Sequence, residues 1–296
     1  MTREHATTTT SLTRYDATAE ASASVVIGRY STSFGAAARL LEPTCRRRIR
    51  VVYALVRIAD EVVDGSAAEA GLSVDEQRAA LDALEEDTER AMRTGYSTNV
   101  IVHAFARTAR ATGIDATLTR PFFASMRRDL DPSPFTADEV ATYIHGSAEV
   151  VGLMCLRAFL AGEQVAPDRL ARLEDGAIHL GAAFQKVNFL RDLAADWRDL
   201  GRNYFPWVDP DAFTEAEKDA ILDDIDADLA ISGRAVAELP PRARSAVAAA
   251  QELFARLATR LRATPADELL RARVRVPDAE KLAIAVRAAV TRGGVR

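Results

Sequence analysis

The chain has 296 residues, of which 48% are hydrophobic, so it can bury a large core. Its 38 basic and 43 acidic residues give a formal net charge of −5 without any extended basic tract, which excludes the usual basic type of nucleic-acid-binding protein. No apolar run reaches the roughly 18 residues that a membrane-spanning helix needs. The two cysteines, Cys45 and Cys155, have no paired spacing, which favours a reduced, cytoplasmic protein.

Residues 1–20 are polar and rich in threonine and lack the apolar run of a signal peptide, so we predict a disordered arm there. Residues 21–296 are dominated by helix-forming residues and show no sustained alternation of apolar and polar positions, which predicts a single all-α domain. No Gly/Ser linker divides it. We expect helices at about 20–40, 44–64, 75–93, 97–112, 118–130, 137–161, 167–198, 214–237, 241–262 and 277–290.

The helix expected at 44–64 carries a pair of aspartates, Asp60 and Asp64, one turn apart on one face. Arg57 lies on the same side one turn earlier. The neighbouring residues are mostly apolar, which is typical of a core helix. Carboxylates in such a setting need a cationic partner.

The helix expected at 167–198 repeats this spacing with Asp192 and Asp196, preceded on nearly the same face by Gln185 and Asn188. Two such helices facing each other can hold Mg²⁺, which prefers carboxylate oxygens and keeps open positions for phosphate. Arg57 would supply fixed positive charge for a phosphate oxygen. The pattern therefore predicts a site for a diphosphate whose leaving-group charge is neutralised by metal.

Loss of diphosphate requires a stabilised carbocation, which an allylic prenyl chain provides. Water must be kept away, because it would quench the cation. Apolar helices around a metal-lined mouth can form such a dry tunnel, since they offer no nucleophile along it.

The two acidic stretches read RIADEVVD from Arg57 and QKVNFLRDLAADWRDLGRNYFP from Gln185. In spacing, order and flanking residues they resemble the two aspartate-rich motifs of the squalene/phytoene synthase family. The segments YSTSF from Tyr30, YIHGSAEVVGLM from Tyr143 and RVRVPDAEKL from Arg273 extend the resemblance to nearly everything after residue 25. It implies an isoprenoid-synthase-type helical bundle around a central cavity.

The resemblance also implies the reaction, in which a prenyltransferase joins two identical prenyl diphosphates head to head. The first substrate ionises, the second attacks its cation, and loss of a proton leaves a cyclopropyl diphosphate that rearranges to the linear product. The implied cofactor is Mg²⁺, or alternatively Mn²⁺, and NADPH is not expected. By this resemblance Asp60, Asp64, Asp192, Asp196 and Tyr143 are catalytic, the same four aspartates and Asn188 bind metal, and Ser31, Ser33, Arg57, Gln185, Asn188, Arg202 and Tyr204 bind the diphosphate.

Three consecutive alanines, Ala36, Ala37 and Ala38, predict the length of the substrate. If Ser33 is near the diphosphate, the helix continuing from it advances about 5.4 Å deeper with each turn, and small side chains leave the tunnel floor open. We therefore favour C20 geranylgeranyl diphosphate and phytoene, a product of carotenoid biosynthesis. The alternative is C15 farnesyl diphosphate, with squalene, dehydrosqualene or presqualene diphosphate as the product.

Several residues depart from the family's pattern. Glu61 stands at a usual aspartate, Glu149 at a glycine and Lys186 at an apolar position, and a tyrosine that often precedes the tail is missing. These changes leave open an enzyme that stops at the cyclopropyl intermediate, a one-substrate terpene cyclase, or a non-catalytic helical scaffold.

Substrate and product of the implied reaction are lipids. Because no spanning helix is predicted, we expect a soluble protein that contacts the inner membrane face peripherally. The sequence leaves the oligomeric state open.

Overall fold

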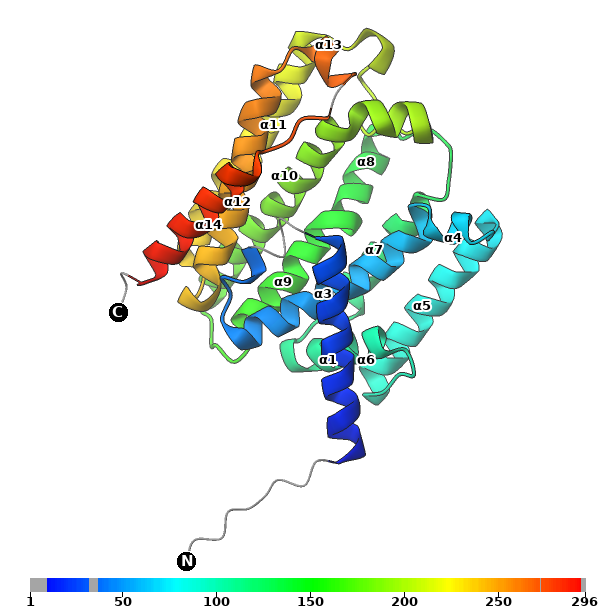
Figure 1. The fold of residues 1–296 in the computed structure, drawn as a ribbon, viewed down its shortest axis with the longest axis vertical. Coiled ribbons are helices and arrows are strands. Elements are labelled where there is room, and N and C mark those ends of the chain that lie inside the picture. The colour runs from blue at the N-terminus through cyan, green and yellow to red at the C-terminus, as the bar shows by residue number, and fades with distance from the viewer. Residues whose placement is uncertain (1–9, 32–36, 272, 294–296) are drawn as a thin grey trace, which may run out of the picture.

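The computed structural model of the protein describes residues 10–31, 37–271 and 273–293, and within them all regular structure is helical (Figure 1). The predicted all-α fold is therefore confirmed. The longer helices are α1 (Ser11–Tyr30), α3 (Pro43–Val63), α5 (Val74–Thr94), α6 (Val100–Thr112), α7 (Ala116–Arg128), α8 (Ala137–Ile144), α9 (Val150–Leu160), α10 (Pro167–Leu200), α11 (Glu215–Glu238), α12 (Pro241–Ala263) and α14 (Asp278–Gly293). The short ones are α4 (Ser66–Glu69), the π-helical turn η1 (His145–Glu149), the 3₁₀ turn η2 (Pro210–Ala212) and α13 (Ala266–Leu269).

Most helix ends carry capping residues that are readable in the sequence. Helices α3, α10 and α12 each begin at a proline, which has no N–H group to leave unsatisfied in the first turn. Helix α5 begins with a capping box in which Ser73 and Glu76 each accept a hydrogen bond from the other's backbone N–H. Helix α10 ends at Gly201, whose φ of 65° costs glycine little. Apart from the first helix, the predicted bounds agree with the observed ones to within three residues, with η1 inside the helix expected at 137–161.

The first helix differs from the prediction. Helix α1 begins at Ser11 and ends at Tyr30, so the predicted disordered arm over residues 1–20 is wrong for residues 11–20, and the helix expected at 20–40 starts too late and runs too far. Residues 1–9 lie outside the described part of the chain, and the arm stays a prediction there.

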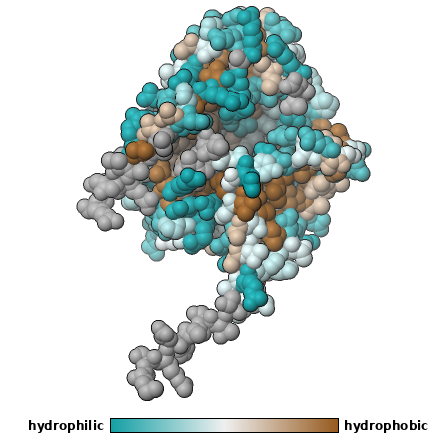
Figure 2. Space-filling view, in the orientation of Figure 1, coloured by the Kyte–Doolittle hydropathy of each residue, from teal (hydrophilic) through white to brown (hydrophobic). Residues whose placement is uncertain are grey.

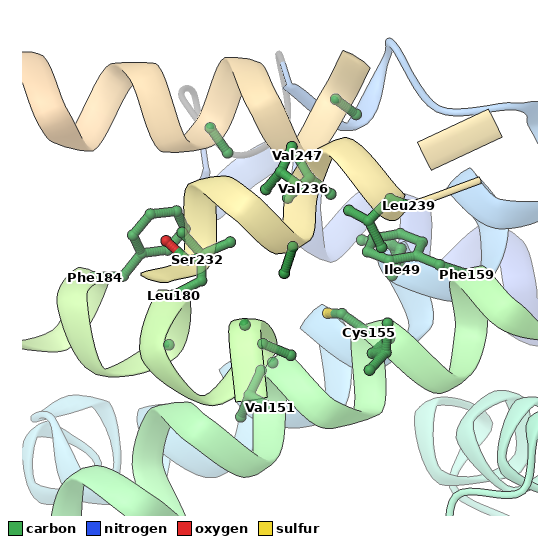
Figure 3. Close-up of a pocket in the computed structure, with 18 of the residues that line it drawn as sticks. Ile49, Val151, Cys155, Phe159, Leu180, Phe184, Ser232, Val236, Leu239 and Val247 are labelled. Atoms are coloured by element: carbon green, nitrogen blue, oxygen red, sulfur yellow. The ribbon is translucent and has the colours of Figure 1, made fainter. Parts of the chain in front are cut away.

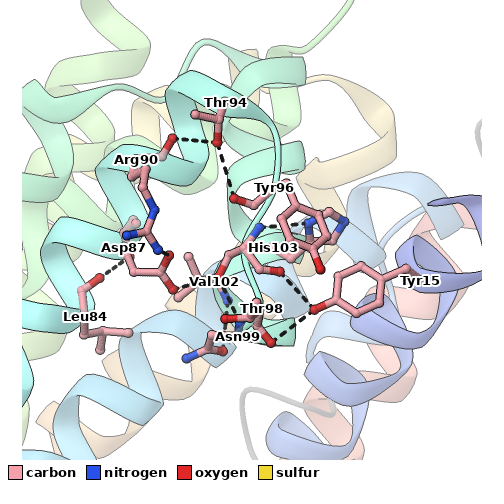
Figure 4. Close-up of polar contacts among 12 residues, drawn as sticks. Tyr15, Leu84, Asp87, Arg90, Thr94, Tyr96, Thr98, Asn99, Val102 and His103 are labelled. Atoms are coloured by element: carbon pink, nitrogen blue, oxygen red, sulfur yellow. Dashed lines mark hydrogen bonds and ion pairs between the residues drawn. The ribbon is translucent and has the colours of Figure 1, made fainter.

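Long-range contacts explain why the start of α1 is ordered. The hydroxyl of Tyr15 shares its one proton between the carbonyl oxygens of Ser97 and Thr98, which lie 2.9 and 3.1 Å away (Figure 4). Oδ1 of Asp16 lies 2.8 Å from Nε2 of the buried His103. These partners come from α6 and the connection before it, so the composition of residues 1–20 alone could not reveal them.

Helix α10 is the longest helix and lies in the middle of the fold. It packs along α11 on one side and against α9 and η1 on the other. Helices α11, α12 and α14 lie in one half of the molecule, and α1, α3, α5 and α6 lie in the other (Figure 1). Each half has its own cluster of buried apolar side chains, and a third cluster lies where α3, α9, α10, α11 and α12 meet. A single domain over residues 21–296 stays a prediction.

The helices around α10 approach it closely at two of its glycines. A Cβ added to Gly181 would lie 2.7 Å from the carbonyl oxygen of Ala148 in η1. A Cβ added to Gly176 would lie 2.1 Å from the Cβ of Ala235 in α11. Both distances are shorter than a van der Waals contact, so glycine is what allows this close packing.

Hydrophilic side chains cover most of the face seen in Figure 2, and hydrophobic ones gather on it beside α1. The exposed large apolar residues include Val25 and Tyr30 on α1 and Trp207 after α10, at 63%, 52% and 60% exposure. Among the helices described, none is both long enough and apolar enough to span a bilayer.

Candidate active site

The predicted acidic pairs lie near the C-terminal ends of α3 and α10. Asp60 is in the last turn of α3, and Asp64 caps that helix with its N–H donating to the Asp60 carbonyl oxygen at 2.8 Å. Asp192 and Asp196 are in the last turns of α10. Arg202, just after α10, brings Nη1 to 4.0 Å from Oδ1 of Asp64. The charge of Asp64 also acts on Asp196, so the tertiary structure brings the two acidic pairs close to each other. We call these four aspartates the acidic mouth.

The carboxylates of the acidic mouth repel one another. Loss of solvent and then the charge of Asp64 raise the pKa of Asp60 to about 8. Loss of solvent and then the charge of Asp192 raise the pKa of Asp196 to about 7, with a further contribution from Asp64. A bound cation would relieve this repulsion and favour the ionised carboxylates.

The donor atoms around the acidic mouth suit a hard divalent cation. Asn188 and Gln185 precede Asp192 by one and about two turns of α10 and carry amide oxygens on nearly the same face. Among the described residues, no three Asp, Glu, His or Cys side chains form a ready-made metal cluster. Mg²⁺ usually takes one or two carboxylates and completes its shell with water and substrate phosphate. Carboxylates on two facing helices fit that mode of binding.

Arg57 lies beside the acidic mouth on α3. It forms an ion pair with Glu61, and its guanidinium carbon is 4.6 Å from the centre of the Tyr30 ring. Glu61, the residue at the usual aspartate position, also accepts a 2.6 Å hydrogen bond from the Ser66 hydroxyl. Nε of Arg57 is buried and has no hydrogen-bond partner within the described ranges. It is therefore a donor suited to an anionic oxygen.

The predicted serines at the end of α1 are only partly described. Ser31 caps α1, and its N–H donates to the Ile27 carbonyl oxygen at 3.0 Å. Ser33 and Ala36 lie outside the described residues, so the roles predicted for them stay predictions.

Asp129, which the sequence analysis did not select, has its carboxylate close enough to the acidic mouth to interact with the charges of Asp60 and Asp64. It follows α7, and its side chain is only 4% exposed. Oδ2 accepts a 2.9 Å hydrogen bond from the hydroxyl of Tyr143, and Oδ1 accepts one of 3.4 Å from Tyr204. Nη1 of Arg202 lies 3.8 Å from the same Oδ1. Burial raises the pKa of Asp129 to about 7 against the opposing charge of Arg202.

The local sequence around Asp129 gives little indication that its carboxylate is buried among these partners. The stretch RRDLDP reads as the end of a helix followed by a turn, and acidic residues in turns are usually exposed. What could have drawn attention to Asp129 is the apolar run PFFASM before it, which predicts a buried helix whose end lies near the core.

Tyr143 and Tyr204 belong to a buried aromatic cluster. The ring of Tyr204 stacks on Phe189 of α10 with the centroids 3.9 Å apart, and Phe135 lies 5.3 Å from Tyr143 and 5.2 Å from Tyr204. Both tyrosines are 6% exposed. Burial is the main cause that raises the pKa of each hydroxyl, so both stay protonated and act as hydrogen-bond donors to Asp129.

Asp192 is paired with two arginines. Arg191, its neighbour on α10, forms one ion pair, and Arg273 from the segment after α13 places Nε 2.7 Å from Oδ1 of Asp192. Nη2 of Arg273 donates a second bond of 3.0 Å to Oδ2. The C-terminal segment therefore reaches the acidic mouth.

An apolar cavity of about 260 Å³ lies alongside α10. Phe184 and Leu180 line one end, and Ile49, Phe159 and Leu239 line the other (Figure 3). This volume exceeds that of the roughly 150 Å³ dry cavity known to bind benzene in another protein. We call this cavity the apolar pocket.

The apolar pocket extends away from the acidic mouth. Phe184 precedes Asp192 by eight residues, or about 12 Å of helix, and Leu173 lies eleven residues further back, or about 16 Å. Cys155 lines the wall, and burial raises the pKa of its thiol to about 12, so the sulfur stays protonated and unreactive.

Two further departures from the family's pattern have local explanations. Nζ of Lys186 forms ion pairs with Asp224 at 2.5 Å and with Asp228 at 2.8 Å. Its charge is therefore compensated by two carboxylates of α11. Glu149 lies 2.9 Å from Nδ1 of His145, and its Cα is only 3.0 Å from where a Cβ on Gly181 would lie. The glycine that allows the close contact is therefore on α10.

The profile of the squalene/phytoene synthase family matches residues 27–280. The chain belongs to this family. Family members are prenyltransferases that depend on a divalent metal, and the predicted membership and enzyme class are confirmed.

Individual family members show how far the similarity extends. The chain is 28% identical over 270 residues to a 15-cis-phytoene synthase of Paracoccus sp., covering 86% of this chain and 85% of that one. It is 28% identical over 253 residues to a phytoene synthase of Pseudescherichia vulneris, covering 79% of each.

Solved structures of the squalene/phytoene synthase type share the fold. A dehydrosqualene synthase in complex with a ligand superposes with a TM-score of 0.77 at 19% identity, covering 95% of this chain and 99% of that one. A squalene synthase from Alicyclobacillus acidocaldarius gives a TM-score of 0.71 at 20% identity, covering 84% and 94%. The predicted isoprenoid-synthase type of bundle is confirmed.

Proposed function

We propose that this protein condenses two molecules of geranylgeranyl diphosphate head to head into phytoene, a step of carotenoid biosynthesis. The observation that carries the proposal is the acidic mouth beside an apolar pocket, which suits a substrate with an anionic head and a hydrocarbon chain. The similarity to two phytoene synthases supports this product over the squalene type.

Separate residues at the acidic mouth would bind the metal, bind the diphosphate and contact the reacting carbons. Mg²⁺, held by the acidic mouth and Asn188, would supply positive charge to the departing diphosphate. Arg57 would donate its unpartnered Nε to a diphosphate oxygen, and Arg202 would approach from the opposite side, next to Asp64. Tyr143 would lie near the reacting carbons. Further contacts to the diphosphate would come from Ser31, Ser33, Gln185 and Tyr204.

The apolar pocket would bind the hydrocarbon chain and exclude water. No reactive thiolate is offered by Cys155, so an allylic cation inside would meet no nucleophile from that residue. Ala37 and Ala38 are among the residues that line the pocket, and Ala38 is 4% exposed. Their small side chains support a C20 substrate, because a bulky residue there would shorten the pocket.

We also propose a cytoplasmic protein that binds the inner membrane face peripherally, where its lipid substrate and product would be found. The exposed Trp207, Tyr30 and Val25 support this, because exposed apolar and aromatic side chains favour the membrane interface. Sedimentation with lipid vesicles that is reversed by alkaline washing would support this. An association that resists salt and alkaline washing would contradict it.

The decisive experiment supplies the purified protein with Mg²⁺ and either C15 or C20 prenyl diphosphate, with and without NADPH, and identifies the extracted hydrocarbon by mass spectrometry. We expect phytoene from the C20 substrate without NADPH. A product from C15 only, or a product built from one substrate molecule, would favour the squalene-type enzyme or the terpene cyclase instead. No release of diphosphate from either substrate would favour the scaffold.

A further inference from the structure

We propose that Asp129 is a positioning residue that holds Arg202, Tyr143 and Tyr204 in their working orientations beside the acidic mouth. The inference rests on the proposed function, because it assigns Asp129 a part in the same diphosphate site. Its basis is a carboxylate that is almost fully buried and contacts all three side chains.

Asp129 holds Arg202 at two points. Nη2 of Arg202 donates to the backbone carbonyl oxygen of Asp129 at 2.5 Å, and Nη1 lies 3.8 Å from its carboxylate. The same Nη1 lies 4.0 Å from Asp64 on its other side. Because the guanidinium is planar and rigid, fixing two of its nitrogens fixes the direction of the whole group.

Without Asp129, the nearest carboxylate for Arg202 would be Asp64. A full ion pair between Arg202 and Asp64 would compete with a metal ion for that carboxylate and would remove Arg202 from the diphosphate. Asp129 therefore keeps Arg202 close to Asp64 but not fully paired with it. A buried arginine also needs a compensating charge, which Asp129 supplies.

The two tyrosines are oriented by the same carboxylate. A phenol has one proton to donate and two lone pairs that can accept. The hydroxyl of Tyr143 donates a hydrogen bond to Oδ2, and the hydroxyl of Tyr204 donates one to Oδ1. Each phenol oxygen therefore keeps its lone pairs for other neighbours. An oxygen in that state attracts positive charge, which suits a site where a carbocation forms.

The test compares Asp129→Asn with Asp131→Asn. Asparagine has nearly the same shape but removes the charge that holds Arg202. Asp131 is exposed, accepts a backbone hydrogen bond from Ser133 and forms no ion pair or side-chain hydrogen bond with the described residues of the site, so the same substitution there is a matched control. Binding of inorganic pyrophosphate in the presence of Mg²⁺, measured by calorimetry, is the main readout, with kcat and KM for the prenyl substrate measured in parallel.

We expect Asp129→Asn to weaken pyrophosphate binding about 10- to 100-fold, because it removes the negative charge 3.8 Å from Nη1 of Arg202 and the charge of the carboxylate that accepts from Tyr143 and Tyr204, although the backbone contact to Arg202 remains. Asp131→Asn should bind as the unmodified protein does. The kcat should fall as well, because the tyrosines lose their orientation. In a double-mutant cycle, Arg202→Lys should add little to the loss of binding caused by Asp129→Asn, because each change alone already removes the correctly oriented Arg202 guanidinium.

The outcomes separate this inference from the proposed function. If the unmodified protein does not bind pyrophosphate with Mg²⁺, or if Asp192→Asn leaves binding unchanged, the proposed function fails. If Asp192→Asn abolishes binding while a folded Asp129→Asn binds normally, or if the losses from Asp129→Asn and Arg202→Lys simply add, this inference alone is overturned. Should Asp129→Asn not fold, Arg202→Lys decides by itself, and unchanged pyrophosphate binding in that variant overturns the inference.

Discussion

The acidic mouth and the apolar pocket lie on the same two helices but are built in different ways. Helix α3 carries Asp60 at the mouth and Ile49 at the far end of the pocket, and α10 carries Asp192 and Leu173 in the same manner. At the mouth, charged groups lie within reach of one another, so a single change alters the energy of its neighbours. In the pocket, the space depends on small residues between closely packed helices. The mouth should therefore respond to changes of charge, and the pocket to changes of volume.

The largest effect is expected at the mouth. Replacing Asp192 or Asp60 with Asn should lower turnover on the order of 10² or more, because in the proposed reaction these carboxylates would hold the metal that neutralises the departing diphosphate. Steady-state release of diphosphate measures this, with circular dichroism as a check of folding. Turnover by the unmodified protein that survives in EDTA would contradict the metal scheme.

A volume change in the pocket should alter substrate choice. Ala38→Phe should depress C20 coupling at least tenfold relative to C15 coupling, because the added ring takes up space that the longer chain needs. The ratio of kcat/KM for the two substrates is the measurement. Ala171→Phe, on an exposed position of α10, is the matched control and should keep the ratio. An unchanged ratio in Ala38→Phe would show that this part of the pocket does not determine which prenyl chain length the enzyme accepts.

The close packing of α10 against α11 should appear in the free energy of unfolding. Gly176→Ala should lower it by about 1–3 kcal/mol, because the added methyl group would lie 2.1 Å from the Cβ of Ala235. Gly28→Ala, in an exposed helical position where an added Cβ has no atom of the described residues within 4 Å, should raise it by about 0.5–1 kcal/mol. Chemical denaturation measures both. Equal effects of the two substitutions would contradict the packing argument.

The raised pKa values at the mouth predict how the metal-free protein responds to pH. Asp60 and Asp196, with pKa values of about 8 and 7, keep protons that the unfolded chain loses above about pH 4. The folded state thus binds more protons between about pH 4 and 8, so its stability in EDTA should fall as the pH rises through this range. Asp60→Asn should be more stable than the unmodified protein by about 1 kcal/mol or more at pH 8, and the difference should vanish near pH 4. Parallel stability curves for the two proteins would contradict the prediction.

The smallest effect is expected at the exposed edge of the mouth. Arg273→Ala should lower the Mg²⁺ concentration for half-maximal activity by less than about fivefold, since an ion pair with a half-exposed arginine contributes about 1 kcal/mol at most. Titration of activity with Mg²⁺ measures the shift. A higher Mg²⁺ requirement would instead indicate that Arg273 helps to bind the substrate.

The sequence by itself determined the features that depend on local interactions. Helix ends at Pro43, Pro167 and Gly201 follow from backbone geometry within one turn, and the pairing of Asp60 with Asp64 follows from the helical repeat. The same motifs were specific enough to indicate the family. Where they lie relative to one another is a different kind of information.

Only the tertiary structure decided which distant residues meet. The order of residues 11–20 depends on partners in and just before α6, and the place of Asp129 depends on Tyr143, Arg202 and Tyr204, which are up to 75 residues away. Such contacts leave no periodic trace in the sequence, because they arise when whole helices pack and bury single polar groups together. A buried carboxylate in that position is stabilised by partners from several elements, so no one segment carries the signal that selects it.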